Sequence, residues 1–537
     1  MHIIYMNSIT QDDYVMKMSN ATMNESTIEG KKNETHVHFK PFLDKQLNSL
    51  KDQNGSSDYS RNESKFNTLS VASSSKLPDY SQAYILVPVV VRLHRQPKTA
   101  AAADQVCGIN DGSDQIQFKS CTTTLVDKME INYGNTSISQ GVKNLNGYQT
   151  YLHHVENSVD DVNLSNTYYK PTTEWLYNKK EGMTFDSVFN DYVVEFEQEK
   201  ENNVLSLMNI EQSGMNYYLK VTEFEHIYFY YAFIKLSEYS FFSALPLSKG
   251  SNIDMTLNFN QSVTTTVYAL GVKTAINHQL TGSTNSLLRI NDVPTPNTCN
   301  FTETLSLSIG QIQGSTKLHE HPLKQCRLYI PEYTLSPEVF SQYISKNSIK
   351  KIVYEDVIVK HLTNLDSGSS IDAMLSSNVS NIQKLVIIPM LSKESNITEV
   401  GFTKYTPQET CYSQEPCTCS PYYISNFQVK VGNQNIYLNN MSFKHDSYML
   451  ELNSAQGVEG GLQRGFKSGQ IKMTDFIKNY GYLTVDLSRK GIEDLNKLFQ
   501  VSISGKIESP KNLDLLCFII VQKQVVIDIS TGTVIQQ

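Results

Sequence analysis

The sequence lacks a long hydrophobic run. No stretch of about 18 apolar residues occurs, and the N-terminus, MHIIYMNSITQDDYVMKM, has no basic segment followed by an apolar core of about 7–15 residues. We therefore expect neither a membrane span nor secretion by a standard signal peptide.

Positive charge is also scarce. The formal net charge is −8 and the pI is about 5.9, and no block rich in Lys and Arg occurs along the chain. A protein that holds nucleic acid usually presents a basic patch to the phosphates. We therefore predict no direct, sequence-specific binding of nucleic acid.

Cysteine is too sparse and irregular for a disulfide framework. The eight thiols are Cys107, Cys121, Cys299, Cys326, Cys411, Cys417, Cys419 and Cys517. Their spacing is compatible with folding in the cytosol or nucleus.

Catalytic motifs are missing as well. The chain contains no G-x-S-x-G, H-E-x-x-H or G-x-G-x-x-G pattern. The stretch GGLQRGFKSG from Gly460 resembles a phosphate-binding loop, but Phe466 separates Gly465 from Lys467, so a surface loop is the better interpretation. We predict that the chain is not an enzyme, and we assign no catalytic and no cofactor-binding residues.

Two groups of residues have side chains that can bind zinc. They are His319, Glu320 and His321 near Cys326, and Cys411 with Cys417 and Cys419. Neither group has paired C-x-x-C spacing, and zinc requires four converging ligands. The acidic pair Asp160 and Asp161 is better interpreted as a solvated loop than as a cation site. We therefore predict no metal ion.

Asn-X-Ser/Thr triplets are frequent and have two interpretations. They begin at Asn20, Asn24, Asn33, Asn62, Asn135, Asn163, Asn260, Asn300, Asn378, Asn396 and Asn440. They would favour a glycosylated surface protein if the chain entered the secretory route. A chain rich in Asn, Ser and Thr also forms them by chance, and the missing signal favours this second interpretation.

The composition indicates a β protein. The chain has 31 Tyr and 22 Phe but one Trp, Trp175, and many Thr, Val and Ile, the residues that suit a pleated, half-buried surface. Strand candidates with turn signals between them recur after Tyr84, with no alternation of strands and helices. These features favour antiparallel β domains.

The chain divides into three regions. Residues 1–80 are dominated by Asn, Ser, Lys, Asp and Glu, and we predict a largely disordered arm. We predict two β domains at 81–338 and 339–537, divided near SPEVFSQYISKN, which has a Ser cap and Pro at the first helical position. In the first domain, YILVPVVVRLHRQ carries Pro88 where an edge strand could tolerate it, and HIYFYYAF from His226 suits a core strand or an interface.

Several segments, taken in order, resemble the hexon-like double jelly-roll major capsid proteins of Polinton/Maverick elements, polinton-like viruses and adintoviruses. They are TLVDKMEINYGNTSI with LNGYQTYLHH, CRLYIPEYTLSPEVFSQYI with KKIVYEDV, CTCSPYYISNFQVKVGNQNIYLNN, GGLQRGFKSGQI, YLTVDLSRK, FQVSISGK and LDLLCFIIVQKQVVIDISTG. The resemblance spans about residues 84–537. It depends on the order of all the segments together, because each segment alone is unspecific.

The resemblance implies an all-β fold of two consecutive eight-stranded jelly rolls with short linker helices. It implies a homotrimer that forms a pseudo-hexameric capsomer and tiles an icosahedral virion shell beside neighbouring capsomers, penton and minor capsid proteins. Assembly is then expected inside the host cell, in the nucleus or cytoplasm. The alternative function is a cell-surface or secreted β-sandwich adhesin, and a third is a carbohydrate-active enzyme with two carboxylates in a deep cleft.

Overall fold

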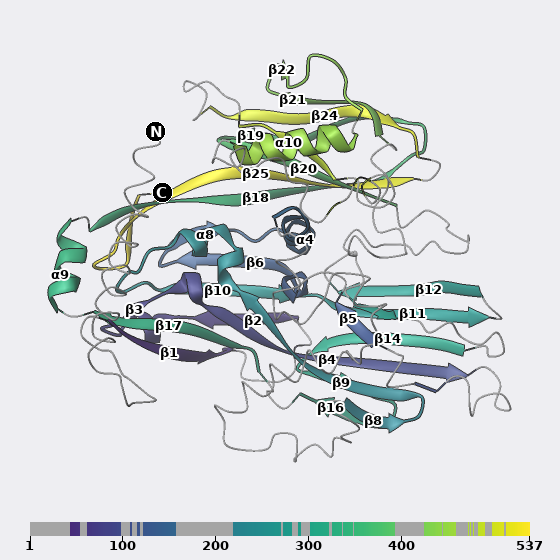
Figure 1. Ribbon diagram of the computed structural model, residues 1–537, viewed down its shortest axis with the longest axis horizontal. Coiled ribbons are helices and arrows are strands. Elements are labelled where there is room, and N and C mark those ends of the chain that lie inside the picture. The colour runs from purple at the N-terminus through teal and green to yellow at the C-terminus, as the bar shows by residue number, and fades with distance from the viewer. Residues whose placement is uncertain are drawn as a thin grey trace, which may run out of the picture.

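The computed structural model describes residues 43–53, 59, 62–97, 108–109, 115–118, 122–156, 218–269, 272–281, 288–291, 301–321, 325–335, 337–346, 348–391, 424–442, 444–457, 471, 473, 476, 482–488, 497–509 and 512–536. Two antiparallel β-sandwiches are built from these residues, one from each half of the chain (Figure 1).

The first sandwich has eight principal strands. In chain order they are β1 (Leu43–Lys51), β2 (Glu63–Asn67), β4 (Tyr84–Pro97), β6 (Val126–Tyr133), β7 (Thr136–Ser139), β9 (Glu225–Lys235), β10 (Ile253–Phe259) and β17 (Arg327–Leu335). One sheet, which we call sheet 1A, has the order β1-β17-β4-β9, and the other, sheet 1B, has the order β2-β10-β6-β7.

The second sandwich also has eight principal strands, and a short ninth strand, β26 (Thr533–Gln536), pairs with the end of β25. The eight principal strands are β18 (Ile349–Leu365), β19 (Ser370–Val379), β20 (Ile382–Leu391), β21 (Ile424–Val431), β22 (Gln434–Asn435), β23 (Leu483–Asp486), β24 (Phe499–Ile507) and β25 (Leu513–Asp528). Sheet 2A has the order β18-β25-β20-β23, and sheet 2B has the order β19-β24-β21-β22.

The two sandwiches share one topology. If the strands of each are numbered from one to eight along the chain, each sandwich has a sheet of order 1-8-3-6 and a sheet of order 2-7-4-5. In both, a helix lies between strands five and six, α4 (Leu145–Glu156) in the first and α10 (His445–Gly457) in the second. This double Greek-key arrangement is the jelly roll, so the predicted fold class is confirmed.

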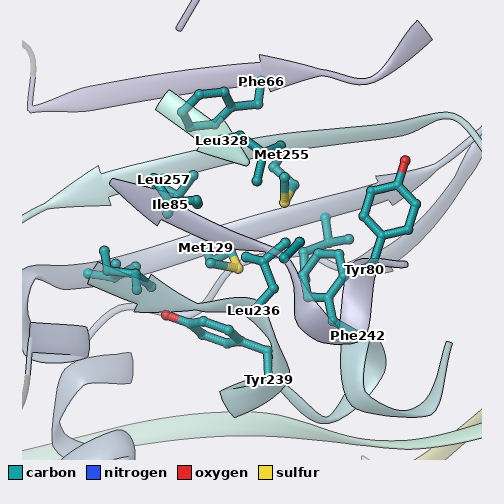
Figure 2. Packing of buried hydrophobic residues seen from close by; sticks show 14 of the residues in the cluster. Phe66, Tyr80, Ile85, Met129, Leu236, Tyr239, Phe242, Met255, Leu257 and Leu328 are labelled. Carbon is teal, nitrogen blue, oxygen red and sulfur yellow. The ribbon is translucent and has the colours of Figure 1, made fainter. Parts of the chain in front are cut away.

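The first core fills the space between sheets 1A and 1B. Alternate residues of β10 are buried, among them Met255 and Leu257, as the period-two pattern predicts. Figure 2 shows these two residues close to Met129 of sheet 1B and to Ile85 and Leu328 of sheet 1A. Aromatic side chains from the short helical elements η1 (Tyr80–Gln82) and α8 (Ser240–Ala244) also pack in this core, with Leu236 of η5 (Leu236–Glu238).

Strand β4 is central in sheet 1A, so the edge-strand interpretation of Pro88 is wrong. Strand β17 pairs with Tyr84–Leu86, β14 (Phe301–Ile309) pairs with Val89–Pro97 along the same side, and β9 covers the other side. The Pro88 carbonyl accepts a hydrogen bond from the Gly310 N–H. The nitrogen of Pro88 points to the same side, where β17 has ended as the neighbouring strand and β14 has not yet begun. A strand can lack an N–H there without losing a ladder bond.

The first sandwich carries an insertion between its seventh and eighth strands. It contains β11 (Gln261–Ala269), β12 (Val272–Thr281), β13 (Leu288–Asn291), β14, β15 (Gln311–Gln313) and β16 (Leu318–Glu320). Strands β14, β11 and β12 extend sheet 1A sideways, and β13 pairs with β5 (Gln115–Phe118) (Figure 1). Strand β8 (Tyr218–Thr222) pairs with β9.

The predicted arm is wrong for residues 43–53 and 62–80. Strand β1 pairs with the whole of β17, and β2 pairs with β10, so the first jelly roll begins well before residue 81. Helix α2 (Leu69–Ala72) and strand β3 (Leu77–Pro78) follow within the same segment. Both β1 and β2 are edge strands, whose polar composition is typical of edges and hides them from hydrophobic-pattern analysis. Residues 1–42 lie outside the described part of the chain.

The predicted linker helix is confirmed as α9 (Pro337–Lys346), between β17 and β18. The division of the chain at residue 338 itself stays a prediction. Strand β9 supports the core interpretation of HIYFYYAF, because Ile227, Tyr228 and Phe229 are buried.

Candidate functional site at the joint between the two sandwiches

The two sandwiches meet in a joint made of three contacts. In the first, α4 lies on the outer face of sheet 2A. In the second, β18 and β25 extend beyond their own sandwich onto the first one. In the third, the turn after β25 meets a loop of the first sandwich. Figure 1 shows α4 and α8 between sheet 1B below and the pair β18 and β25 above.

The first contact begins with the spacing of residues on α4. Tyr148, Tyr151 and Val155 are three and four positions apart, which places them on one face of the helix. All three are buried in a cluster with alternate residues of sheet 2A, including Phe518 and Ile520 of β25. The Tyr148 and Phe518 ring centroids lie 5.6 Å apart.

Sheet 2A is covered on both faces, which explains its composition. Along β25, Leu515, Cys517 and Ile519 point into the second sandwich, whereas Phe518 and Ile520 point toward α4 and α10. A strand buried on both sides is expected to be a continuous hydrophobic run, as LLCFIIV is here.

Hydrogen bonds tie α4 to the second sandwich inside this apolar cluster. The Tyr151 and Thr484 hydroxyls lie 3.0 Å apart, and His154 Nδ1 lies 2.8 Å from the Tyr482 hydroxyl. Burial lowers the pKa of His154 to about 3, and the adjacent His153 acts in the same direction. Burial also raises the pKa of Tyr151. His154 is therefore neutral, and the contact favours uncharged partners.

The second contact uses the parts of β18 and β25 that project past the second core. Ile352 and Tyr354 of β18, with Val525 and Ile527 of β25, are buried in the first sandwich's cluster. The Tyr354 hydroxyl donates to the Ile138 carbonyl on β7, 3.1 Å away, and burial raises its pKa.

An ion pair flanks this second contact. The Asp356 carboxylate on β18 accepts from the Lys523 ammonium at 2.6 Å and from the Ser139 hydroxyl of the first sandwich at 3.3 Å. Because two strands are shared between two cores, the sandwiches cannot separate without exposing both.

The third contact is a close backbone crossing. The Lys249 N–H donates to the Ile529 carbonyl at 2.9 Å. Gly250 has a φ of +75°, and a Cβ atom placed on it would lie 2.3 Å from the Thr531 carbonyl oxygen. Only glycine fits this position, since an L side chain would meet both the unfavourable φ and the neighbouring backbone.

The joint fixes the order of the layers. In Figure 1 the sheets follow one another as 1A, 1B, 2A and 2B, so sheet 1B of one sandwich faces sheet 2A of the next. The two outer layers, 1A and 2B, are therefore different in kind.

Residues singled out from the sequence are placed apart from the joint. His319 lies on β16, and the His321 N–H donates to the Gly310 carbonyl at 2.7 Å. The Cys326 N–H donates to the Tyr59 hydroxyl at 2.8 Å, and burial raises the pKa of the Cys326 thiol to about 12. Within the described residues, no group of three His, Cys, Asp or Glu side chains could hold a metal ion.

Other residues discussed from the sequence lie outside the described part of the chain. They are Cys107, Cys121, Cys299, Cys411, Cys417, Cys419, Asp160, Asp161, Trp175 and the segment from Gly460 to Gly469. Cys517 is described, and it is a buried free thiol, as Cys326 is.

One Asn-X-Ser/Thr triplet begins inside the protein. Asn260 is completely buried and its side-chain amide donates to the Thr124 carbonyl at 3.0 Å, so no glycan can be attached there in the folded chain. Among the described helices, none combines the length and apolarity needed to span a bilayer.

Sequence reasoning missed the joint residues Tyr148, Tyr151, His154 and Tyr482. The signal that could have indicated them is the Tyr-x-x-Tyr-x-x-His spacing on α4, together with a β25 run that is apolar on both faces. Two ion pairs in sheet 1A were also missed, Arg92 with Glu225 at 2.6 Å and Arg95 with Glu303 at 2.9 Å.

Comparisons with known proteins give structural neighbours only. No family model and no curated protein sequence matches the chain. The Sputnik virophage structure from cryo-electron microscopy aligns with a TM-score of 0.47 at 11% identity, covering 95% of this chain and 91% of that one. The mavirus major capsid protein aligns at 0.37 and 9% identity, covering 95% and 92%. The Faustovirus major capsid protein aligns at 0.38 and 10% identity, covering 95% and 98%. The jelly-roll assignment above rests on strand order and register, independently of these similarities.

Proposed function

We propose that this chain is a major capsid protein, a structural subunit that trimerises into a pseudo-hexameric capsomer and tiles an icosahedral viral shell. The observation that carries the proposal is the joint, because it turns two complete jelly rolls into one rigid unit with unlike outer layers. No step of this role requires catalysis, a cofactor or a membrane span.

The head-to-tail order of the layers supports a closed ring. Inside one chain, sheet 1B of the first sandwich faces sheet 2A of the second (Figure 1). If the same relation is repeated between chains, sheet 2B of one copy faces sheet 1A of the next. A heterologous contact of this kind closes into a ring when its rotation allows, and three two-sandwich chains then place six similar units around one axis.

The two outer layers carry side chains that suit such a contact. On sheet 1A, the half-buried rings of Tyr84 and Phe233 pack with the buried ring of Tyr329, and the Tyr84 centroid lies 5.1 Å from Tyr329 and 5.5 Å from Phe233. On the sheet 2B side, Met374 of β19 is 54% exposed and Leu438 after β22 is fully exposed. Aromatic residues and Met are enriched where proteins associate.

The finer assignments belong to the same proposal. The chain would belong to the Polinton/Maverick, polinton-like virus and adintovirus group. It would contact neighbouring capsomers, penton proteins and minor capsid proteins. It would assemble in the nucleus or cytoplasm and then remain in the virion. We also propose residue 338 as the boundary between the two jelly rolls.

Mass measurement of the purified chain by light scattering tests the proposal. We expect a particle of three chains for the unaltered protein and a shift to single chains when Met374→Glu and Leu438→Glu are combined. Leu69→Glu is the matched control, because Leu69 is 60% exposed on α2 and belongs to neither outer layer. A single chain in the unaltered protein, with attached glycans in its mass spectrum, would instead support the adhesin.

A further inference from the structure

His154 is buried between the two sandwiches. It belongs to α4 of the first sandwich, and its partner Tyr482 comes immediately before β23 of the second. The imidazole is 1% exposed, and the centroids of the two rings lie 6.0 Å apart. A proton on this ring would place a charge in the middle of the apolar contact that holds α4 on sheet 2A.

The charged groups around the joint are held by their own partners. On α4, the neighbouring His153 has its Nε2 3.3 Å from a carboxylate oxygen of Glu238 on η5. On sheet 2A, the Lys384 ammonium lies 3.8 Å from the Glu355 carboxylate.

Helix α10 also packs against the cluster that surrounds the α4 contact. Its Glu451 carboxylate accepts from the Asp486 N–H at 3.0 Å, and its His445 ring packs edge-on to Phe476 at 5.5 Å. The neighbouring His153 also acts on His154: a positive charge on the His153 ring opposes protonation of His154 and so lowers its pKa.

We propose that the joint is an acid-sensitive latch, in which protonation of His154 releases α4 from the second sandwich. The latch lies within one chain, so it stands whether or not the chain builds a shell. The proton binds to His154, and the contact that opens is the one between α4 and sheet 2A.

The direction follows from linkage. In the closed joint burial lowers the pKa of His154 to about 3, and in an opened joint the imidazole returns toward its ordinary value of 6.5. The open form therefore binds more protons between these two values. The closed joint is fully favoured above pH 6.5, and below it the ratio of closed to open falls roughly tenfold per pH unit.

Other histidines require a local measurement. Burial also lowers the pKa of His94 and His319 in the first sandwich, so acid would weaken that sandwich as a whole. Loss of global stability at low pH would not identify the latch, whereas the protection of α4 relative to β10, a core strand of the same sandwich, does.

Hydrogen exchange of the full chain at pH 7.5 and pH 5, corrected for the intrinsic exchange rate, provides this measurement. We expect the exchange of peptide 145–156 to rise roughly thirtyfold at pH 5, while the exchange of peptide 253–259 of β10 rises much less. In His154→Gln the rise should be abolished, and in His153→Gln, the matched control, it should remain.

Three outcomes overturn the proposal. They are unchanged protection of α4 in the unaltered chain, an equal loss of protection in α4 and β10, or a full acid response in His154→Gln. If His154→Gln does not fold, the comparison of the two peptides in the unaltered chain still decides.

Discussion

Phe518 and Ile519 are adjacent residues on β25 that should have different roles. Both are completely buried, but Phe518 points to α4 and Ile519 points into the second sandwich. Truncating Phe518 to Ala removes a buried ring and leaves a cavity, which costs about 3–5 kcal/mol. About 0.5–1.5 kcal/mol of this belongs to the ring pair with Tyr148. Ile519→Ala costs a similar amount, about 2–5 kcal/mol, from a different core.

Native-state hydrogen exchange separates the two effects. In Phe518→Ala we expect peptide 145–156 of α4 to lose most protection, and in Ile519→Ala peptide 499–507 of β24. A double-mutant cycle of Phe518→Ala with Tyr148→Ala should give a coupling of about 0.5–1.5 kcal/mol. The same exchange pattern in both single variants would refute the assignment of opposite faces, and with it the joint.

Three further predictions follow from other described contacts. Gly250→Ala should cost clearly more unfolding free energy than Gly368→Ala in chemical denaturation, because both have a φ of +75° but a Cβ on Gly368 meets nothing within 4 Å; equal costs would contradict the close crossing. Glu303→Gln should destabilise the chain by about 3–5 kcal/mol because the buried Arg95 guanidinium loses the negative charge opposite it, whereas replacing both by Met should restore much of the loss; a neutral Glu303→Gln in thermal unfolding would argue against this pair. The Cys326 thiol should react with a thiol reagent at neutral pH only on unfolding, because burial raises its pKa to about 12; rapid reaction in the native chain would refute its burial.

The strands that the sequence predicted well are those in which a local pattern matches burial. In β10, buried residues alternate with partly exposed ones from Ile253 to Phe259, and in β25 the residues from Leu513 to Val521 are all buried. The local hydrophobic pattern is enough to predict these strands, because one face of β10 and both faces of β25 are buried.

The strands that were missed are stabilised by distant partners. Strand β1 pairs with β17 across nearly 300 residues, and its polar composition carries no strand signal. Pro88 was assigned to an edge because the change of neighbour along β4 is a property of the assembled sheet. The joint depends on side chains such as Tyr151 and Thr484 that are 333 positions apart, so no local pattern could bring them together.

Electron microscopy of the purified chain would show directly whether it forms a capsomer. We expect three-fold particles in which each chain contributes two jelly rolls stacked through α4 and the β18–β25 pair, giving six sandwiches around the axis. Particles in which the two sandwiches of a chain lie apart or vary in relative orientation would contradict the rigid joint, and with it the capsomer.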